Sequence, residues 1–263
     1  MADFLVGYGI LAGAALACVG VVRWFAGRGP GTLDRPPAVL DLAYLRGGFT
    51  HACHACLAGL HRAGAIRPAE LSTLVAVGPP SEAWPPLMVA LHAGLRTAQS
   101  WTHVTALPEV LRAGERVRRR LLRRGLLLST TRQRWMKAAT APLFAVAAVG
   151  VARLVASAAG EAPAGKPGET VGLILAVTGT ALAGWLLLEV PAVSGAGRRA
   201  IRRAARELRA APEGGSTALV MRKVAVGGRR ALVALAPTIA VVIGVSWGKR
   251  APFYVARSGS RIR

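Results

Sequence analysis

The chain of 263 residues combines a formal charge of +22 with 53% apolar residues, a pairing that is unusual in a soluble protein. Apolar bulk and strong basicity together indicate membrane spans joined by basic segments. Three cysteines are too few for a disulfide framework, and the sequence has no G-x-S-x-G, H-E-x-x-H or P-loop motif. We therefore expect an integral membrane protein that is not an enzyme and needs no cofactor.

The first predicted element is the apolar run at residues 4–22. Its nineteen residues carry no charge, which is long enough for a helix to cross roughly 30 Å of hydrocarbon. A signal peptide would have basic residues before the run, whereas here MADF precedes it and Arg23 and Arg28 follow it. We expect residues 1–28 to be an uncleaved anchor in the cell (plasma) membrane, with its N-terminus outside.

Residues 29–137 are expected to form a small cytosolic domain, which begins with a Gly/Pro-rich linker at 27–38. The pattern then predicts a short helix that ends near Arg46, a turn at Gly47-Gly48 and a second helix over 50–63. Thr50 suits the N-cap of that second helix, and Gly64 suits the position after its end.

The second half of this domain repeats one feature of the first. After a Pro-rich break at 78–86, helices are predicted around 86–98 and from about Pro108 to Arg124. The segments 60–66 and 121–127 share the pattern L-x-R-x-G-x-(I/L), a helix end followed by a strand candidate. Helix, turn, helix, glycine and strand is the order of a winged helix. Two winged-helix-like units of α(+β) type are therefore predicted.

The hexapeptide HACHAC at 51–56 contains two of the three cysteines and two of the five histidines, which makes it the main candidate for a metal or redox site. On a helix, the residues Cys53, Cys56, Leu57 and Leu60 form one apolar stripe. The other side carries His51, His54, His61 and Arg62, which we expect to face solvent. Ligands that point in opposite directions cannot converge on one zinc ion, so we expect core cysteines. A thiol or metal sensor that uses His51, His54, Cys53 and Cys56 remains the alternative.

The basic segment 115–137 leads directly into the next apolar run. We expect five of its arginines to face lipid and to attract anionic headgroups, namely Arg116, Arg119, Arg120, Arg123 and Arg124. The simpler interpretation is charge that only sets topology. Binding of nucleic acid is the least favoured of the three interpretations, because the helix at 50–63 has few side chains that could recognise bases.

A transmembrane helical hairpin is predicted at 138–192. One helix covers about 138–158 and contains Arg153, and the other covers about 170–192 and contains Glu189. The basic segments on both sides of the hairpin place those sides in the cytoplasm by the positive-inside rule. Arg153 and Glu189 lie near opposite ends of antiparallel helices, so each is expected to reach its own interface rather than to pair with the other.

Residues 193–263 form a basic C-terminal region. Its apolar run at 231–247 is barely long enough to span and contains Pro237. A fourth span there would put the basic tail outside, against the positive-inside rule. A re-entrant helix, an interfacial helix and a helix packed on the others remain the alternatives.

Four stretches carry a resemblance to a known family: LDLAYLRGG (40–48), LHRAG (60–64), RRRLLRRGLLLS (118–129) and GRRAIRRAARELR (197–209). Over about residues 38–210 the chain resembles actinobacterial membrane proteins whose domain is named for lying near an "uncomplexed" Cys-rich tail. That family has no assigned role, so the resemblance implies membrane location and layout rather than an activity. This sequence has no cysteine after Cys56, so we expect no function that depends on such a tail.

The fold class expected from the sequence is an all-α or mainly α integral membrane protein. The expected function is that of a membrane-anchored scaffold, which presents its cytosolic domain to a protein partner. A membrane-bound DNA-binding regulator and the thiol or metal sensor are the alternatives, and a homo-oligomer is left open.

Overall fold

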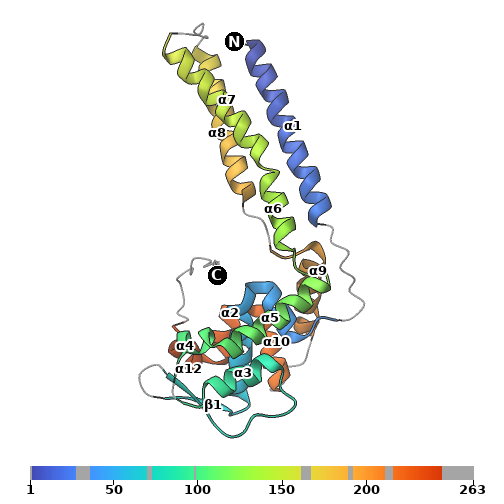
Figure 1. The fold of residues 1–263 in the computed structure, drawn as a ribbon, viewed down its shortest axis with the longest axis vertical. Helices are drawn as coiled ribbons and strands as arrows, with labels where there is room; N and C mark the ends of the chain where they lie inside the picture. Colours follow the sequence, from blue (N-terminus) through green and yellow to red (C-terminus); the bar gives the residue numbers. More distant parts are fainter. Residues whose placement is uncertain are drawn as a thin grey trace, which may run out of the picture. The chain divides into compact units, whose positions relative to one another are not determined.

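The computed structural model describes residues 2–27, 36–69, 73–97, 99–160, 167–188, 192–210 and 216–244 (Figure 1). The chain is mainly helical and divides into two compact units. The first, which we call the three-helix unit, comprises Met1–Pro36 and Arg118–Arg202. The second, which we call the helical domain, comprises Pro37–Val117 and Arg203–Arg263. Because each unit is built from two separate stretches, the chain passes between the units three times.

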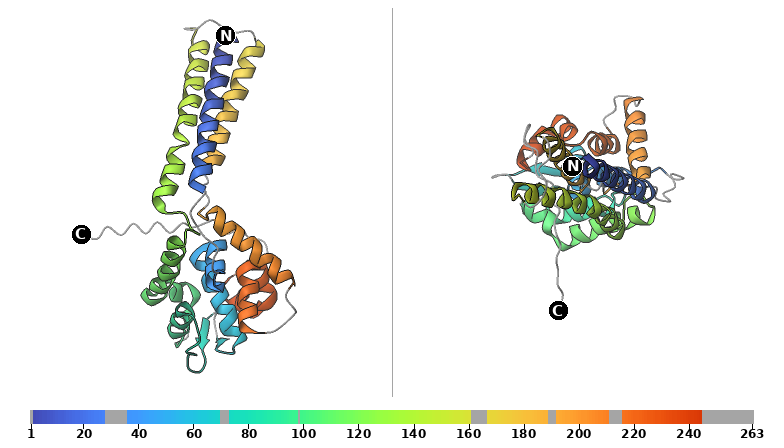
Figure 2. Two further views of the ribbon diagram at one scale, coloured as in Figure 1. Left: turned by 90° about the vertical axis from the view of Figure 1, so that its right-hand side faces the viewer. Right: turned by 90° about the horizontal axis from the view of Figure 1, so that it is seen from above.

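Long apolar helices form most of the three-helix unit, namely α1 (Ala2–Gly27), α7 (Ala141–Ala158) and α8 (Pro167–Leu188). They lie side by side and contact one another in pairs (Figures 1 and 2). Small buried clusters around Tyr8 and Val19 join them, while most of their other apolar side chains are exposed. Within the described residues, three segments are long and apolar enough to cross a membrane: Asp3–Phe25, Thr130–Ala158 and Thr170–Leu187. This agrees with the membrane protein that the sequence predicts.

The second candidate span is interrupted near its start. Helix α6 (Thr130–Ala138) ends before α7 begins, and the Thr140 hydroxyl donates to the Lys137 carbonyl, 2.7 Å away, within that break. Pro142 lies in the first turn of α7, where its missing N–H costs no helical hydrogen bond.

A short antiparallel bridge connects the two chain segments that flank the hairpin. Leu127 pairs with Val193. The amide of Leu128 donates to the Ala192 carbonyl at 2.9 Å, and the amide of Ser194 donates to the Leu126 carbonyl at 3.0 Å. In the segment LLLS (126–129), where the sequence offers a strand candidate after Gly125, the structure therefore has only this single bridge.

The helical domain is built around one hydrophobic core. Its elements are α2 (Val39–Arg62), β1 (Ile66–Pro68), β2 (Thr73–Ala76), α3 (Pro86–Gly94), β3 (Gln99–Ser100), α4 (Trp101–Ala106), α10 (Thr217–Gly227), α11 (Arg229–Leu235) and α12 (Pro237–Val242). Helices α5 (Pro108–Arg123) and α9 (Gly195–Ala210) begin in one unit and end in the other. Of the described elements, α2 and α10 make the most extensive contact.

At the centre of this core a Gly-Gly pair breaks the helical path twice. Gly47-Gly48 lies within α2, and Gly227-Gly228 lies at the junction of α10 and α11. Within α2, Gly48 has φ 72° and ψ −160°, a backbone conformation open essentially to glycine alone. Gly228, which follows α10, has φ 74° and ψ −151°. Gly64 and Gly244, each sixteen residues beyond its kink, also have positive φ. The break within α2 and the break between α10 and α11 therefore have the same backbone geometry.

A three-stranded antiparallel sheet borders the core in the order β1-β2-β3. Ile66 pairs with Ala76, and Thr73 pairs with Ser100. The helix ends that the sequence pattern links are indeed alike: the Ala65 amide donates to the Leu60 carbonyl at 2.9 Å, and the Leu126 amide donates to the Leu121 carbonyl at 3.0 Å. Only the first of these ends continues into a sheet, and the winged-helix arrangement itself stays a prediction.

The apolar run at 231–247 belongs to the helical domain as far as it is described. It forms α11 and α12, which meet at Ala236 because Pro237 interrupts the helical hydrogen bonds. Leu232 and Ile239 are fully buried in the core that also contains α2. Of the alternatives that the sequence left open, helices packed on other helices are therefore observed. The basic tail at 249–263 lies outside the described residues.

Candidate functional site

The two thiols of HACHAC lie in the core. Cys53 and Cys56 sit in the second half of α2 and have no exposed surface. Burial raises the pKa of both thiols, and for Cys56 the neighbouring Cys53 adds to the rise. A thiol with a raised pKa holds little thiolate, which is the nucleophile and the metal ligand. Neither cysteine therefore has the environment of a redox or metal-binding residue.

The expectation that the histidines face solvent is wrong for His51 and His54. Only 8% of His51 and 9% of His54 is exposed. The Nε2 atom of His51 lies 3.1 Å from the Val224 carbonyl oxygen of α10, and the ring of His54 stacks on Trp101 with 5.7 Å between centroids. Other elements thus cover the side of α2 that its own periodicity marks as polar.

The buried histidines carry little charge near neutral pH. Burial lowers the pKa of His51, and the nearby Arg46 lowers it further. Burial, His51 and Arg229 together lower the pKa of His54 to about 4. Among the described residues, no group of three or more His, Cys, Asp or Glu side chains is placed to hold a metal ion. All six residues of HACHAC are therefore buried in the helical domain.

The predicted lipid-facing arginines lie on one amphipathic helix. The apolar side of α5 is buried at Val110, Ala113, Val117 and Leu121. Its other side exposes Arg116, Arg119, Arg120 and Arg123, and Arg124 follows the helix end, half-buried. Arg116 belongs to the helical domain, whereas the other four belong to the three-helix unit. That these five arginines face lipid stays a prediction.

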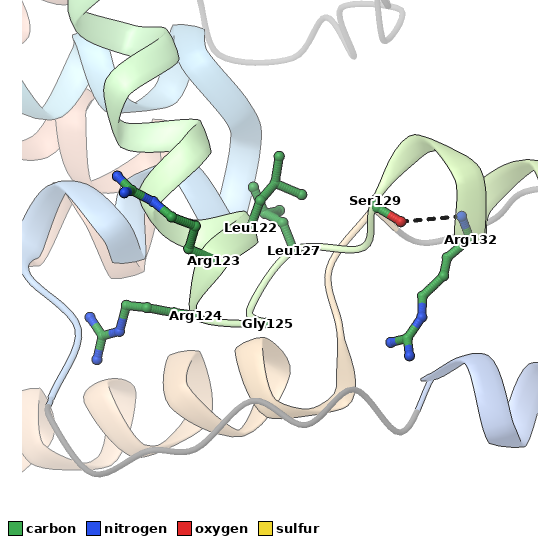
Figure 3. A pocket seen from close by; sticks show the side chains of 7 residues that line it. All are labelled: Leu122, Arg123, Arg124, Gly125, Leu127, Ser129 and Arg132. Carbon is green, nitrogen blue, oxygen red and sulfur yellow. Dashed lines mark hydrogen bonds between the residues drawn. The ribbon is translucent and has the colours of Figure 1, made fainter.

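A pocket of about 370 Å³ opens where α5 ends and α6 begins. Its lining residues all belong to the three-helix unit: Leu122, Arg123, Arg124, Gly125, Leu127, Ser129 and Arg132 (Figure 3). Gly125 has φ 65°, which allows the chain to turn sharply out of α5. Figure 3 shows the guanidinium groups of Arg123 and Arg124 on one side of the pocket and that of Arg132 on the other.

Arg132 is the pocket residue that the sequence reasoning missed. Its amide donates to the Ser129 hydroxyl oxygen at 3.3 Å, which caps the N-terminus of α6. Its side chain is exposed, and no described carboxylate pairs with it or with Arg123. Arg132 could have been found from its place in the first turn of the second candidate span.

Three exposed tryptophans lie at the end of the three-helix unit where this pocket opens. Trp24 is in the last turn of α1, Trp135 is in α6, and Trp185 is near the end of α8. The Arg23 guanidinium donates to the Leu187 carbonyl and so joins the ends of α1 and α8. Tryptophans collect at the depth of lipid headgroups in membrane proteins. The pocket therefore lies at the end of the three-helix unit that carries these tryptophans.

Of the two charged residues predicted in the hairpin, Arg153 lies among the described residues, and the expectation that it does not pair with Glu189 stays a prediction. The Cζ atom of Arg153 lies 5.7 Å from the centroid of the Phe4 ring, near the start of α1. Glu189 lies outside the described residues.

No family model, curated protein or solved structure matches the chain, so the function has to be argued from the residues themselves.

Proposed function

We propose that the protein is a membrane-anchored scaffold that presents its helical domain to a protein partner in the cytosol. The proposal is carried by one observation: the chain passes between the three-helix unit and the helical domain three times. A domain with three connections to its membrane unit stays at the bilayer even if its own affinity for lipid is weak. The N-terminus is outside in this proposal, because basic segments flank the hairpin on the side of the domain.

Two further features support interaction rather than chemistry in the helical domain. The cysteines are buried with raised pKa values, which disfavours the thiol sensor. Every residue from His51 to Leu60 is buried, which leaves that part of α2 without a face to insert into a DNA groove. The resemblance to the actinobacterial membrane family fits an anchored domain but adds no activity.

A photo-crosslinking experiment in living cells tests the scaffold proposal. A photoreactive amino acid would replace Leu111 in α5 or Val241 in α12, which are exposed apolar residues of the helical domain. The control position is Leu175 of α8, an exposed residue of a candidate span. We expect one protein at near-stoichiometric yield from a domain position and only lipid from Leu175. Lipid or scattered background products from all three positions would refute the proposal.

Labelling of a cysteine introduced at Glu82 tests the orientation. Glu82 is exposed, whereas Cys53 and Cys56 are buried in the same domain. We expect a membrane-impermeant maleimide to label E82C only after the cells are permeabilised. Labelling of intact cells would place the domain outside and overturn the orientation.

A further inference from the structure

The membrane-proximal part of the three-helix unit carries a charge of one sign. We call residues 118–137 and 192–202 the neck. The neck has no Asp or Glu, and its basic residues are Arg118, Arg119, Arg120, Arg123, Arg124, Arg132, Arg134, Lys137, Arg198, Arg199 and Arg202. Topology alone requires only a bias in Lys and Arg between the two sides of the membrane. The neck has, in addition, a pocket and an aromatic belt at the same level.

The pocket combines the two kinds of surface that a phospholipid headgroup needs. Leu122 and Leu127 give it a half-buried apolar wall, and Arg123, Arg124 and Arg132 also line it. A volume of about 370 Å³ falls in the range of roughly 300–1,000 Å³ that is usual for ligand sites. Arginine can bind a phosphate through two parallel hydrogen bonds, and its long side chain can turn towards a ligand.

The position of the pocket distinguishes a lipid from a soluble anion. Ser129 and Arg132 lie at the start of the segment Thr130–Ala158, which is a candidate span. Trp135, one turn further along α6, is 69% exposed and marks the headgroup level. A phosphate bound here would therefore lie beside hydrocarbon, which an acyl chain can fill and an inorganic ion cannot.

We propose that this pocket binds the phosphate of an anionic phospholipid, with Arg123 and Arg132 as its principal contacts. This inference goes beyond the scaffold function and does not depend on it. Removing one arginine from the surface of an anionic membrane should weaken lipid binding by about fivefold. Replacing both should therefore weaken it by about 25-fold if their contributions add.

The test compares two variants of the full-length protein that have the same net charge. R123Q/R132Q removes two exposed arginines at the pocket, and R198Q/R199Q removes two exposed arginines of the neck that do not line it. Native mass spectrometry of the detergent-solubilised protein would measure binding of phosphatidylglycerol, of phosphatidylcholine and of inorganic phosphate.

We expect the wild-type protein and R198Q/R199Q to prefer phosphatidylglycerol to phosphatidylcholine by at least tenfold, and R123Q/R132Q to lose that preference. R123K/R132K keeps the charge but loses the paired hydrogen bonds, so it should recover only part of the binding. Equal losses in the two glutamine variants would overturn the pocket, since only diffuse charge would then act. Inorganic phosphate bound as tightly as phosphatidylglycerol would overturn the lipid. Neither result would bear on the scaffold proposal, which the photo-crosslinks test separately.

Discussion

The contact between α2 and α10 makes a quantitative prediction about Gly59 and Met221. A Cβ atom at Gly59 would lie 2.6 Å from both Cγ and Sδ of Met221 and 3.4 Å from Cε of Met88. Overpacking of this kind costs about 1–3 kcal/mol, and the better helix propensity of alanine returns about 1 kcal/mol. G59A should therefore lower the free energy of unfolding of the helical domain by about 0–2 kcal/mol.

The second substitution of this double-mutant cycle, M221A, removes the side chain that alanine at position 59 would meet. M221A alone should cost about 2–5 kcal/mol, because Met221 is a core residue with 6% of its surface exposed. In the M221A background the clash is absent, so G59A should become neutral or stabilising by up to about 1 kcal/mol. The coupling energy between the two positions is therefore expected to be about 1–3 kcal/mol, with the double variant more stable than the sum predicts.

The buried thiols provide the assay for this cycle. Cys18, which is exposed on α1, would first be replaced by alanine, so that only Cys53 and Cys56 remain. These two thiols react with a maleimide only when the helical domain opens, so the ratio of their rate to that of an unfolded peptide gives the free energy of opening. Additivity of the two substitutions within about 0.3–0.5 kcal/mol would refute the contact.

The remaining predictions use the same alkylation assay. Gly48 has a backbone conformation that alanine rarely adopts, so G48A should cost about 1–3 kcal/mol, whereas G13A, in open space on α1, should not change the opening of the domain. The pKa of His54 is lowered to about 4 in the folded state, so the unfolded state binds more protons below the ordinary pKa of about 6.5, and His54 should make stability fall as the pH drops from about 6.5 towards 4, by up to about 1.4 kcal/mol per pH unit. The lowered pKa of His51 acts in the same direction, so H54F should reduce the slope of this profile, and an equally steep profile would contradict the assignment. The Ser216 hydroxyl accepts from the Leu219 amide at 3.3 Å at the start of α10, so S216A should cost about 1 kcal/mol and S216D should restore it; equal losses in both would argue against the cap.

The elements that the sequence predicts best are those with local signals. Uninterrupted apolar length predicts the candidate spans, and the glycines at 64 and 125 mark helix ends that the structure contains. The partner of α2 had no local signal, because periodicity indicates which side of a helix is apolar and not which distant helix covers it. That is why the sequence assigned 29–137 and 193–263 to separate regions, whereas the structure places described parts of both in one core.

The candidate site was predictable only in part for the same reason. The apolar stripe with Cys53 and Cys56 was local, and both cysteines are in the core. His51 and His54 were assigned to solvent because an imidazole counts as polar, yet Val224 and Trp101 come from other elements and cover them. Charge alone predicted basic residues near the membrane. It could not predict that Arg132 joins Arg123 around a pocket, which depends on the turn at Gly125.

The two-part construction of the helical domain has a consequence for its biosynthesis. Helix α2 leaves the ribosome roughly 150 residues before α10, an interval on the order of 10–30 s at ordinary rates of translation. Both helices of the hairpin are synthesised during that interval, so the side of α2 that packs on α10 has no partner helix while they insert. If one of them failed to insert, α10 would emerge on the opposite side of the membrane from α2. The folded core would then never close, and the quality control of the cell could recognise wrong topology simply as an unfolded domain.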